Sequence, residues 1–403
     1  MKFLIITQVY WPDTASTAQH LADIAEYLTS MQHEVTVISG RHAYENPSIR
    51  YKPEETRNGV KIKRIRSTAF GKKTVAGRLM DFLTFNCSLI FKLAALKKKE
   101  VEVMIGMTSP PLVSFFGVWF AKRKRINFHY WTMDLQPELS IASGLMKKDA
   151  LPTKVLTSMG NYIFRNSDNI IALDKYMGIH ITNRGAAKEA VSIIPVWPVM
   201  DSVYEGSREA NPFRISNNFG DRIVIMYSGN HSFVHPLDTV LDAAAELADD
   251  PRFLFVFIGE GVRKKDVTRY KEKHQLENIL QLPYQPREMI HLSLGSADLQ
   301  VVILGENQVG FTHPNKVYGA MFIGKPILYV GPRESHIGDI LEHCSGNIFV
   351  QTGKGKELAG KLKQFAEKGV EFWQQTGQRN SEYAKQHFHP DTLKSKMAEI
   401  LTS

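Results

Sequence analysis

The chain has almost no cysteine, since only Cys87 and Cys344 occur among its 403 residues. Two cysteines cannot build the disulfide framework that stabilises small secreted domains, and they suit a reducing compartment. We also expect no signal peptide, because Met1 and Lys2 lead directly into an apolar strand pattern and an acidic helix follows it. The sequence therefore predicts a cytoplasmic protein.

Long hydrophobic runs are missing as well. The most apolar helical pattern, residues 75–99, is interrupted by Lys92 and falls short of the ~18 to 20 residues that a membrane span needs. Residues 61–99 nevertheless contain eleven basic residues against one acid, Asp81. This helix could lie on the inner face of the plasma membrane, or it could be a core helix with a solvated basic end. The residues that would contact anionic headgroups are Arg78, Lys97, Lys98 and Lys99.

Several catalytic signatures are absent. There is no P-loop, no Ser-His-Asp elbow and no carboxylate pair in the sequence context of a hydrolase. His231 and His235 have metal-ligand spacing, but they span a strand-to-helix loop and imply no third ligand. The net charge of +9 is not accompanied by a recognised nucleic-acid-binding module. We expect no metal, no cofactor and no nucleic-acid partner.

What the chain does contain is a regular alternation of short apolar runs with helix-length segments, in a composition that is 43% hydrophobic. Runs of this length favour parallel strands buried on both faces, as in doubly wound α/β proteins. An irregular stretch at 195–220 interrupts the alternation, which predicts Rossmann-like domains over 1–196 and 197–387. The predicted strands begin at Lys2 and His33 and continue at 60–66, 102–106, 126–131, 169–173, 191–194, 222–229, 253–259, 279–282, 299–303, 327–330 and 347–350.

The segment from Gly310 to Pro326 predicts a helix entrance followed by a strand. Pro314 suits a position at or near a helix start, so the amides of Asn315, Lys316 and Val317 would be free to bind an anion. Lys316 would add a positive charge. An ordinary helix cap fits the same residues, and the segment alone does not decide between the two interpretations.

The chain resembles family 4 glycosyltransferases, and most closely the bacterial enzymes that build O-antigens, capsules and related polysaccharides. The resemblance covers nearly the whole chain and rests on the segments YWPDTASTAQHLADIAEYLTSMQHEVTVISG, GMTSPPLVSFFGVWFA, HYWTMDLQPELSIASG, IVIMYSGN, FLFVFIGEG, ADLQVVIL and HPNKVYGAMFIGKPIL. The pairing of Thr108–Pro111 with Asp134–Glu138 is typical of that subgroup. It implies the GT-B fold, with two Rossmann-like domains facing across a cleft, a nucleotide-sugar donor, no catalytic metal, and a last helix, 388–403, that returns to the N-terminal domain.

The resemblance also assigns residues to the donor. It implies that the diphosphate binds at the loop of Gly229 to His235 and at residues 312–316, and that Leu282 to Tyr284 hold the base. The predicted donor residues are Ser16, Gly229, Asn230, His235, Gly259, Gly261, Pro283, Tyr284, Thr312, His313, Asn315 and Lys316.

On the acceptor side, Asp134 and Glu138 follow a predicted strand and are the catalytic candidates. Each could orient the sugar or take the proton of the acceptor hydroxyl, and each could instead be a helix cap or a structural ion pair. Tyr10 and Trp11, in the loop after the first strand, are predicted to face the acceptor or the membrane.

The sequence departs from the family pattern at its charged positions. Asn230 and His235 stand where many members carry an arginine and a lysine, and Met133 stands in place of a histidine. Phe311 and Gly319 replace a pair of glutamates, for which the nearby Glu306 could substitute.

The resemblance, together with these patterns, implies an enzyme that transfers a sugar from a nucleotide-sugar, expected to be a UDP-sugar, to a saccharide or lipid-linked saccharide hydroxyl. We expect retention of configuration and a role in surface polysaccharide biosynthesis. The missing charges leave two alternatives open. One is a UDP-sugar 2-epimerase-like isomerase, and the other is a catalytically silent protein that binds sugar nucleotides.

Overall fold

The computed structural model describes residues 1–43, 46–71, 74–97, 99–110, 113–199 and 202–403. These residues form two compact units. The first unit contains Met1–Val196, Gly310–His313 and Asp391–Ser403, and the second contains Trp197–Val309 and Pro314–Pro390. The chain therefore passes between the units four times.

The first unit is built on an eight-stranded sheet with the order β3-β4-β2-β1-β5-β6-β7-β8. All neighbouring strands are parallel except the pair of β3 and β4. Successive strands run outward from β1 in one direction and then from β5 in the other, so the order reverses between β1 and β5. The strands are β1 (Lys2–Ile6), β2 (Glu34–Gly40), β3 (Glu54–Arg57), β4 (Val60–Ile65), β5 (Val103–Met107), β6 (Asn127–Trp131), β7 (Asn169–Ala172) and β8 (Val191–Ile193).

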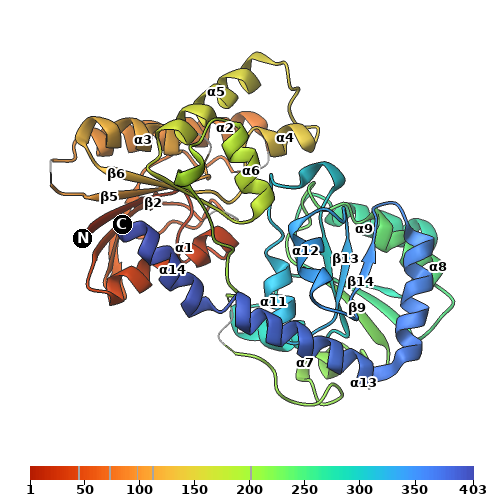
Figure 1. Cartoon of the computed structure of the whole chain (residues 1–403). Helices are drawn as coiled ribbons and strands as arrows, with labels where there is room; N and C mark the ends of the chain where they lie inside the picture. The colour runs from red at the N-terminus through yellow and green to blue at the C-terminus, as the bar shows by residue number, and fades with distance from the viewer. Residues whose placement is uncertain (44–45, 72–73, 98, 111–112, 200–201) are drawn as a thin grey trace. The chain divides into compact units, whose positions relative to one another are not determined.

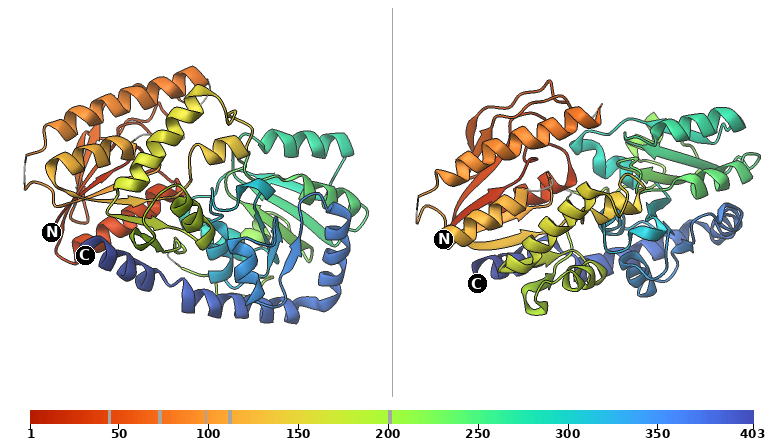
Figure 2. Two further views of the ribbon diagram at one scale, coloured as in Figure 1. Left: turned by 45° about the horizontal axis from the view of Figure 1, so that its top comes forward. Right: turned by 90° about the horizontal axis from the view of Figure 1, so that it is seen from above.

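Helices cover both faces of this sheet, as expected for parallel strands that are buried on both sides. Figure 1 shows α2, α3 and α5 along one face and α1 and α14 along the other, and the views in Figure 2 agree. In α1, apolar residues recur at helical spacing from Ala18 to Leu28 and are buried. The helices are α1 (Ser16–Ser30), α2 (Val75–Ala94), α3 (Val113–Lys124), α4 (Glu138–Ala142), α5 (Leu151–Asn166), α6 (Lys175–Asn183), η1 (Lys188–Ala190) and α14 (Pro390–Thr402).

The second unit has a six-stranded sheet with the order β11-β10-β9-β12-β13-β14, and all of its pairs are parallel. Here the strand order reverses between β9 and β12. The strands are β9 (Ile223–Ser228), β10 (Phe253–Ile258), β11 (Ile279–Leu282), β12 (Leu299–Ile303), β13 (Ile327–Val330) and β14 (Ile348–Val350). The helices are α7 (Pro212–Ser216), α8 (Asp238–Glu246), α9 (Lys264–His274), η2 (Arg287–Met289), α10 (Ile290–Gly295), η3 (Glu306–Gln308), α11 (Lys316–Phe322), α12 (His336–Glu342) and α13 (Gly355–His387).

Every strand that the sequence predicts is present, with small shifts at the ends. The strand β3 and the short helix α7 were not predicted. The sequence of β3, EETR, is polar because the strand lies at the edge of its sheet. The helix α2 ends at Ala94, so the prediction that it runs into the lysines at 97–99 is wrong.

Within the described ranges, no helix is both long enough and apolar enough to cross a bilayer.

The start of the second unit depends on one buried carboxylate. Asp298 accepts hydrogen bonds from Arg208 Nε at 2.6 Å, from Arg214 Nη1 at 3.3 Å and from the amide of Val224 at 2.8 Å. The Asp298 side chain is 3% exposed and that of Arg214 is 2% exposed. Removing one partner from such a buried cluster leaves uncompensated charge, which is strongly destabilising.

We therefore predict that Asp298→Ala lowers the free energy of unfolding by roughly 3 to 5 kcal/mol. The measurement is urea denaturation followed by circular dichroism. Glu246→Ala is the control, because Glu246 pairs with Lys356 only at the surface, at 3.9 Å. Its effect is expected to stay within about 0.5 kcal/mol. Equal shifts for the two variants would contradict the role given to Asp298.

Candidate functional site

The second unit gathers polar loops where its strand order reverses. In open parallel sheets, ligands bind at the carboxyl ends of the strands at such a point. The loop after β9 begins with Gly229, and the carboxyl end of the neighbouring β12 is Ile303. His235, in the β9 loop, joins the two, because its Nδ1 lies 3.0 Å from the carbonyl oxygen of Ile303.

Three glycines that were predicted to bind the donor allow the loops after β9 and β10 to make backbone contact. The amide of Gly229 donates to the carbonyl of Ile258 at 2.8 Å. A Cβ on Gly259 would lie 2.2 Å from the carbonyl oxygen of Gly229, and one on Gly261 would lie 2.5 Å from Oδ1 of Asn230. Gly229, Gly259 and Gly261 all have φ near +130 to +140° (132, 131 and 140°), where other residues are strained. Their absence of side chains thus serves the packing of one loop against the other.

Lys316 is the first residue of α11, and its side chain lies against the backbone of Gly229 at the start of the β9 loop. Its Cε would lie 2.5 Å from a Cβ on Gly229. Its Nζ donates to the hydroxyl of Tyr227 at 2.5 Å and lies 3.7 Å from the centroid of the Tyr227 ring. The side chain is partly buried, and desolvation lowers the pKa of Lys316 to about 7. Among the described residues, no carboxylate forms an ion pair with it.

Two histidines of the β9 loop are held neutral beside this lysine. His231 is 1% exposed, and burial followed by the charge of Lys316 lowers its pKa to about 4. The same two causes, in the same order, hold the pKa of His235 well below its ordinary value. Because a carbonyl oxygen only accepts, Nδ1 of His235 carries the proton that it shares with Ile303. Neither imidazole therefore contributes a fixed positive charge.

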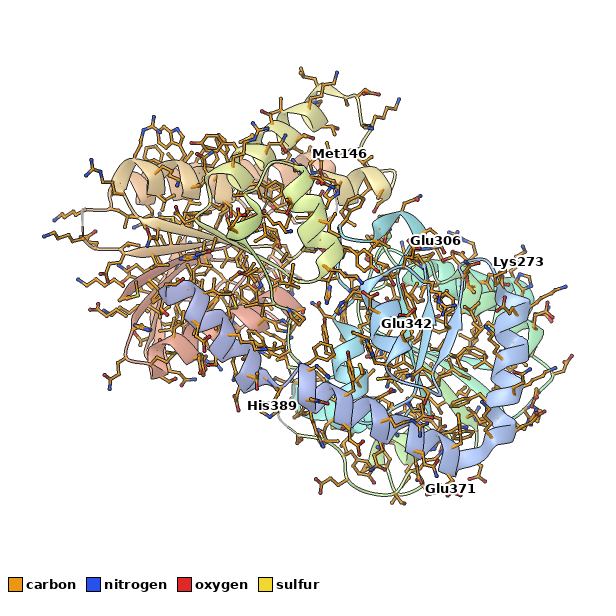
Figure 3. The ribbon with its side chains drawn as sticks, viewed as in Figure 1. Met146, Lys273, Glu306, Glu342, Glu371 and His389 are labelled. Atoms are coloured by element: carbon orange, nitrogen blue, oxygen red, sulfur yellow. The ribbon has the colours of Figure 1, made fainter. Side chains whose placement is uncertain are left out.

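Tyr284 and Pro283 are exposed directly after β11, and the base-binding role predicted for them stays a prediction. The Tyr284 side chain is 47% exposed, and its Cε1 would lie 3.2 Å from a Cβ on Gly259. Glu306, labelled in Figure 3, follows β12 and belongs to the same unit. Its Oε1 accepts the amide of Thr352 at 3.3 Å, so the carboxylate already has a backbone partner.

The entrance to α11 differs from the prediction. Pro314 lies near the start of the helix, which begins at Lys316, but the amide of Val317 donates to the carbonyl of Pro314 at 3.3 Å. The prediction that this amide is free is therefore wrong. The amide is used because the chain makes a tight turn through Asn315 before the helix starts.

Thr312 and His313 lie in the part of the chain that groups with the first unit. The Thr312 hydroxyl donates to Oδ1 of Asp134 at 2.6 Å, and Nδ1 of His313 lies 2.7 Å from Oδ2 of Asp174. Asp174 also accepts the amide of Met177 at the start of α6. Both residues that the resemblance assigns to the donor are thus bonded to carboxylates of the first unit.

Asp134 lies beyond the carboxyl end of β6. It lines a cavity with Thr108 and apolar residues that include Leu135, Met159 and Phe164. The residue is accessible to water, yet the surrounding protein reduces its solvation and raises the pKa of its carboxyl. The Thr312 hydrogen bond and His313 oppose this effect. A water-accessible carboxyl with a raised pKa can exchange protons with a bound hydroxyl.

Glu138 starts α4 and is the centre of a different arrangement. Its Oε1 accepts from Nη1 of Arg184 at 2.5 Å, and His180 Nε2 lies 3.9 Å away. Burial would raise the pKa of Glu138, but His180 and Arg184 outweigh it and hold the pKa below its ordinary value. Arg184 passes over Gly160, where a Cβ would lie 2.7 Å from Nη2, and also bonds Asn161 and Thr157.

The first-loop residues occupy separate environments. Tyr10 is 3% exposed, and burial raises its pKa. Trp11 lies under Arg57, whose Cζ is 4.7 Å from the ring centroid. The hydroxyl of Ser16 lies 3.2 Å from Nδ1 of His20 within α1. The roles predicted for these residues stay predictions.

On the basic segment, Lys97 and Lys99 are exposed after the end of α2. Lys98 and the side chain of Arg78 lie outside the described residues.

The sequence did not single out Tyr227, Asp174 or Arg184. Tyr227 lies inside an apolar strand, where a tyrosine is most simply a core residue. The role of its hydroxyl becomes evident only from its contacts with Lys316 and Asn230. Asp174 and Arg184 bond residues 139 and 46 positions away in the chain, which no local spacing reveals. Across the ranges that the structure describes, no group of three or more His, Cys, Asp or Glu side chains is arranged to hold a metal ion.

Comparison with known proteins agrees with this architecture. Anabaena Alr3699/HepE, crystallised with UDP and glucose, superposes with a TM-score of 0.76 at 15% identity, over 100% of this chain and 99% of that one. A likeness of this kind shows the fold, which is GT-B.

Two curated relatives are similar in sequence. The putative colanic acid biosynthesis glycosyl transferase WcaI of Escherichia coli (strain K12) is 22% identical over 359 residues, covering 86% of this chain and 87% of the relative. The probable glycosyltransferase WbjE of Pseudomonas aeruginosa is 23% identical over 248 residues, or 61% of each chain. Residues 209–387, almost all in the second unit, match the family model described as glycosyl transferases group 1. These matches identify the chain as a glycosyltransferase that is similar to group 1 over residues 209–387.

Proposed function

We propose that this enzyme transfers a sugar from a UDP-sugar to a hydroxyl of a saccharide, with retention of configuration, in the biosynthesis of a surface polysaccharide. The observation that carries the proposal is Lys316, a partly buried cation without a carboxylate partner in the described residues, at the strand reversal of the second unit. A desolvated cation in such a place suits a diphosphate. The UDP bound by Alr3699/HepE and the colanic acid biosynthesis for which WcaI is named support the choice of nucleotide and pathway.

In this mechanism Lys316 stabilises the negative charge that develops on the leaving diphosphate. Fixed charges aimed at a developing anion are worth more in a poorly solvated site than in water. Tyr284 supports the base, and the backbone of the β9 loop approaches the phosphates at Gly229. We propose that the reaction needs no metal ion.

Asp134 is the residue that we assign to the acceptor hydroxyl. It is accessible and lines a cavity, whereas Glu138 is committed to Arg184. We assign Glu138 a positioning role, because the ion pair connects α4 to the end of α6, and Arg184 further bonds α5.

The exposed apolar side chains of α2 support a membrane-bound acceptor. Leu79, Leu83 and Phe91 are 56%, 47% and 76% exposed, and Lys92, Lys97 and Lys99 are exposed near them in the sequence. Apolar side chains next to lysines suit the headgroup region of an anionic bilayer. We propose a cytoplasmic enzyme that docks peripherally on the membrane and uses a lipid-linked saccharide.

The first prediction concerns Lys316→Met and UDP binding measured by calorimetry. A bound anion raises the pKa of Lys316 from its free value of about 7. Wild type is therefore expected to bind roughly 10- to 100-fold more tightly than the variant below pH 7. Above pH 7 the advantage falls by up to about tenfold per pH unit, because binding then requires proton uptake. The ratio of affinities cancels the ionisation of UDP itself.

Lys273→Met is the control for that experiment, since Lys273 is exposed on α9. It is expected to bind UDP like wild type. If no nucleoside diphosphate binds to wild type, the proposed function is wrong. If UDP binds but no acceptor is ever glycosylated, a silent binding protein becomes the better hypothesis.

The second prediction compares Asp134→Asn with Glu138→Gln. Asp134→Asn is expected to lower kcat by about 10²- to 10⁴-fold and to leave UDP affinity unchanged. Glu138→Gln is expected to affect mainly the thermal stability, because it weakens the pair with Arg184. EDTA is included in the assay, because the proposed reaction needs no metal ion and its rate is therefore expected to be the same with and without the chelator. An intact Glu138→Gln protein with the larger loss of kcat would reverse the two assignments.

The third prediction concerns membrane docking. Leu79→Asp and Leu83→Asp together, or Lys97→Glu and Lys99→Glu together, are expected to weaken binding to phosphatidylglycerol-containing vesicles by about tenfold or more. Ile215→Asp, which changes an exposed apolar residue of α7, is the matched control. Unchanged sedimentation of both double variants with vesicles would rule out docking through α2.

A further inference from the structure

Tyr227 is a buried tyrosine whose hydroxyl is the direct neighbour of Lys316. It lies near the carboxyl end of β9, and its side chain is 1% exposed. Its hydroxyl donates to the carbonyl oxygen of Asn230 at 2.7 Å. Because the only hydroxyl proton is used there, the oxygen can serve Lys316 only as an acceptor.

The geometry fixes the lysine from two sides. Nζ of Lys316 lies 2.5 Å from the Tyr227 hydroxyl and 3.7 Å from the ring centroid, so the ammonium has both a hydrogen-bond acceptor and an aromatic face. On the other side, the bare backbone of Gly229 leaves room for the lysine stem, since Cε would lie 2.5 Å from a Cβ there. A flexible side chain is thereby held at the start of the β9 loop.

Tyr227 also connects the lysine to the loop itself. The carbonyl that it binds belongs to Asn230, and the amide of the next residue, His231, donates to the carbonyl of Glu260 in the β10 loop at 2.8 Å. The Tyr227 hydroxyl thus connects the Lys316 ammonium by hydrogen bonds to the backbone of the β9 loop, which is itself bonded to the β10 loop. Burial raises the pKa of Tyr227 well above its ordinary value, so it stays a neutral phenol under working conditions.

We propose that Tyr227 is a positioning residue for the donor diphosphate, because its hydroxyl holds the Lys316 ammonium at Gly229. The inference rests on the proposed function and adds a residue to it. Tyr227 itself does not touch the reacting atoms. It acts through Lys316, replacing the restraint that an ion pair would otherwise supply.

The test is a double-mutant cycle of Tyr227→Phe and Lys316→Met, with UDP as the probe in calorimetry near pH 6.5. Tyr227→Phe is expected to weaken UDP binding roughly tenfold, because the lysine loses its acceptor. The double variant is expected to bind no more weakly than Lys316→Met alone, within about twofold. Additive losses would mean that Tyr227 acts independently of Lys316, which overturns the proposal.

A second readout is the pH profile of UDP affinity, taken relative to Lys316→Met. Without the hydroxyl the ammonium is less stabilised, so the fall in affinity is expected at lower pH in Tyr227→Phe than in wild type. A merely structural tyrosine would leave the midpoint in place. Tyr329→Phe is the matched control: Tyr329 is equally buried, and its hydroxyl donates to Pro332 instead.

Should Tyr227→Phe fail to fold, Tyr227→Met supplies a second variant without the hydroxyl, because a flexible methionine fills a buried space in a different way. The same loss of UDP binding, absent in the Lys316→Met background, is expected. If UDP binds wild type and Lys316→Met is weakened while Tyr227→Phe and Tyr227→Met are not, the inference is wrong and the proposed function stands. If wild type does not bind UDP, the proposed function itself fails.

Discussion

Parallel strands impose the constraint on which both sites depend. Each strand must be followed by a crossover that returns the chain to the opposite end of the sheet, and such crossovers are almost always right-handed. When successive strands are added first on one side of a sheet and then on the other, the two strands at the reversal have crossovers that lead to opposite sides. The loops that follow these two strands therefore diverge at the carboxyl end of the sheet. In the second unit those loops follow β9 and β12, and His235 and Lys316 lie there. In the first unit they follow β1 and β5, where the amide of Gln8 donates to the carbonyl of Ser109.

Few of the basic side chains at the strand reversal of the second unit carry a charge, and Lys316 is held in place by its neighbours. Two histidines are neutral because burial and the neighbouring ammonium oppose their protonation. Lys316 can supply a positive charge there, and its ammonium is held by a hydroxyl and a ring in place of a carboxylate. A carboxylate partner would compete with a phosphate for the same ammonium, whereas a tyrosine does not. The replacement of arginine and lysine by Asn230 and His235 is thus consistent with one well-placed lysine.

Phe311, which stands where the family pattern has a glutamate, makes apolar and backbone contacts within the first unit. The ring of Phe311 lies 4.6 Å from that of His180, and its carbonyl accepts the amide of Leu135. With Thr312 and His313 bonded to Asp134 and Asp174, this short segment is part of the first unit. An apolar ring suits that environment, where an unpaired carboxylate would be costly to bury.

The sequence by itself determined the class of fold and, apart from β3, the strands, and it predicted the region of each candidate site. Short apolar runs that are bounded by glycine and alternate with helix-length segments favour buried parallel strands, and the loops that follow such strands collect at one edge of the sheet. The edge strand β3 was missed because a half-solvated strand such as EETR has no apolar pattern. Tertiary structure decided which polar groups pair. The contacts of Tyr227 with Lys316, Glu138 with Arg184 and Thr312 with Asp134 join residues 89, 46 and 178 positions apart. Such pairings arise only when the sheet brings distant loops together, because hydrogen bonds depend on separation in space and not along the chain.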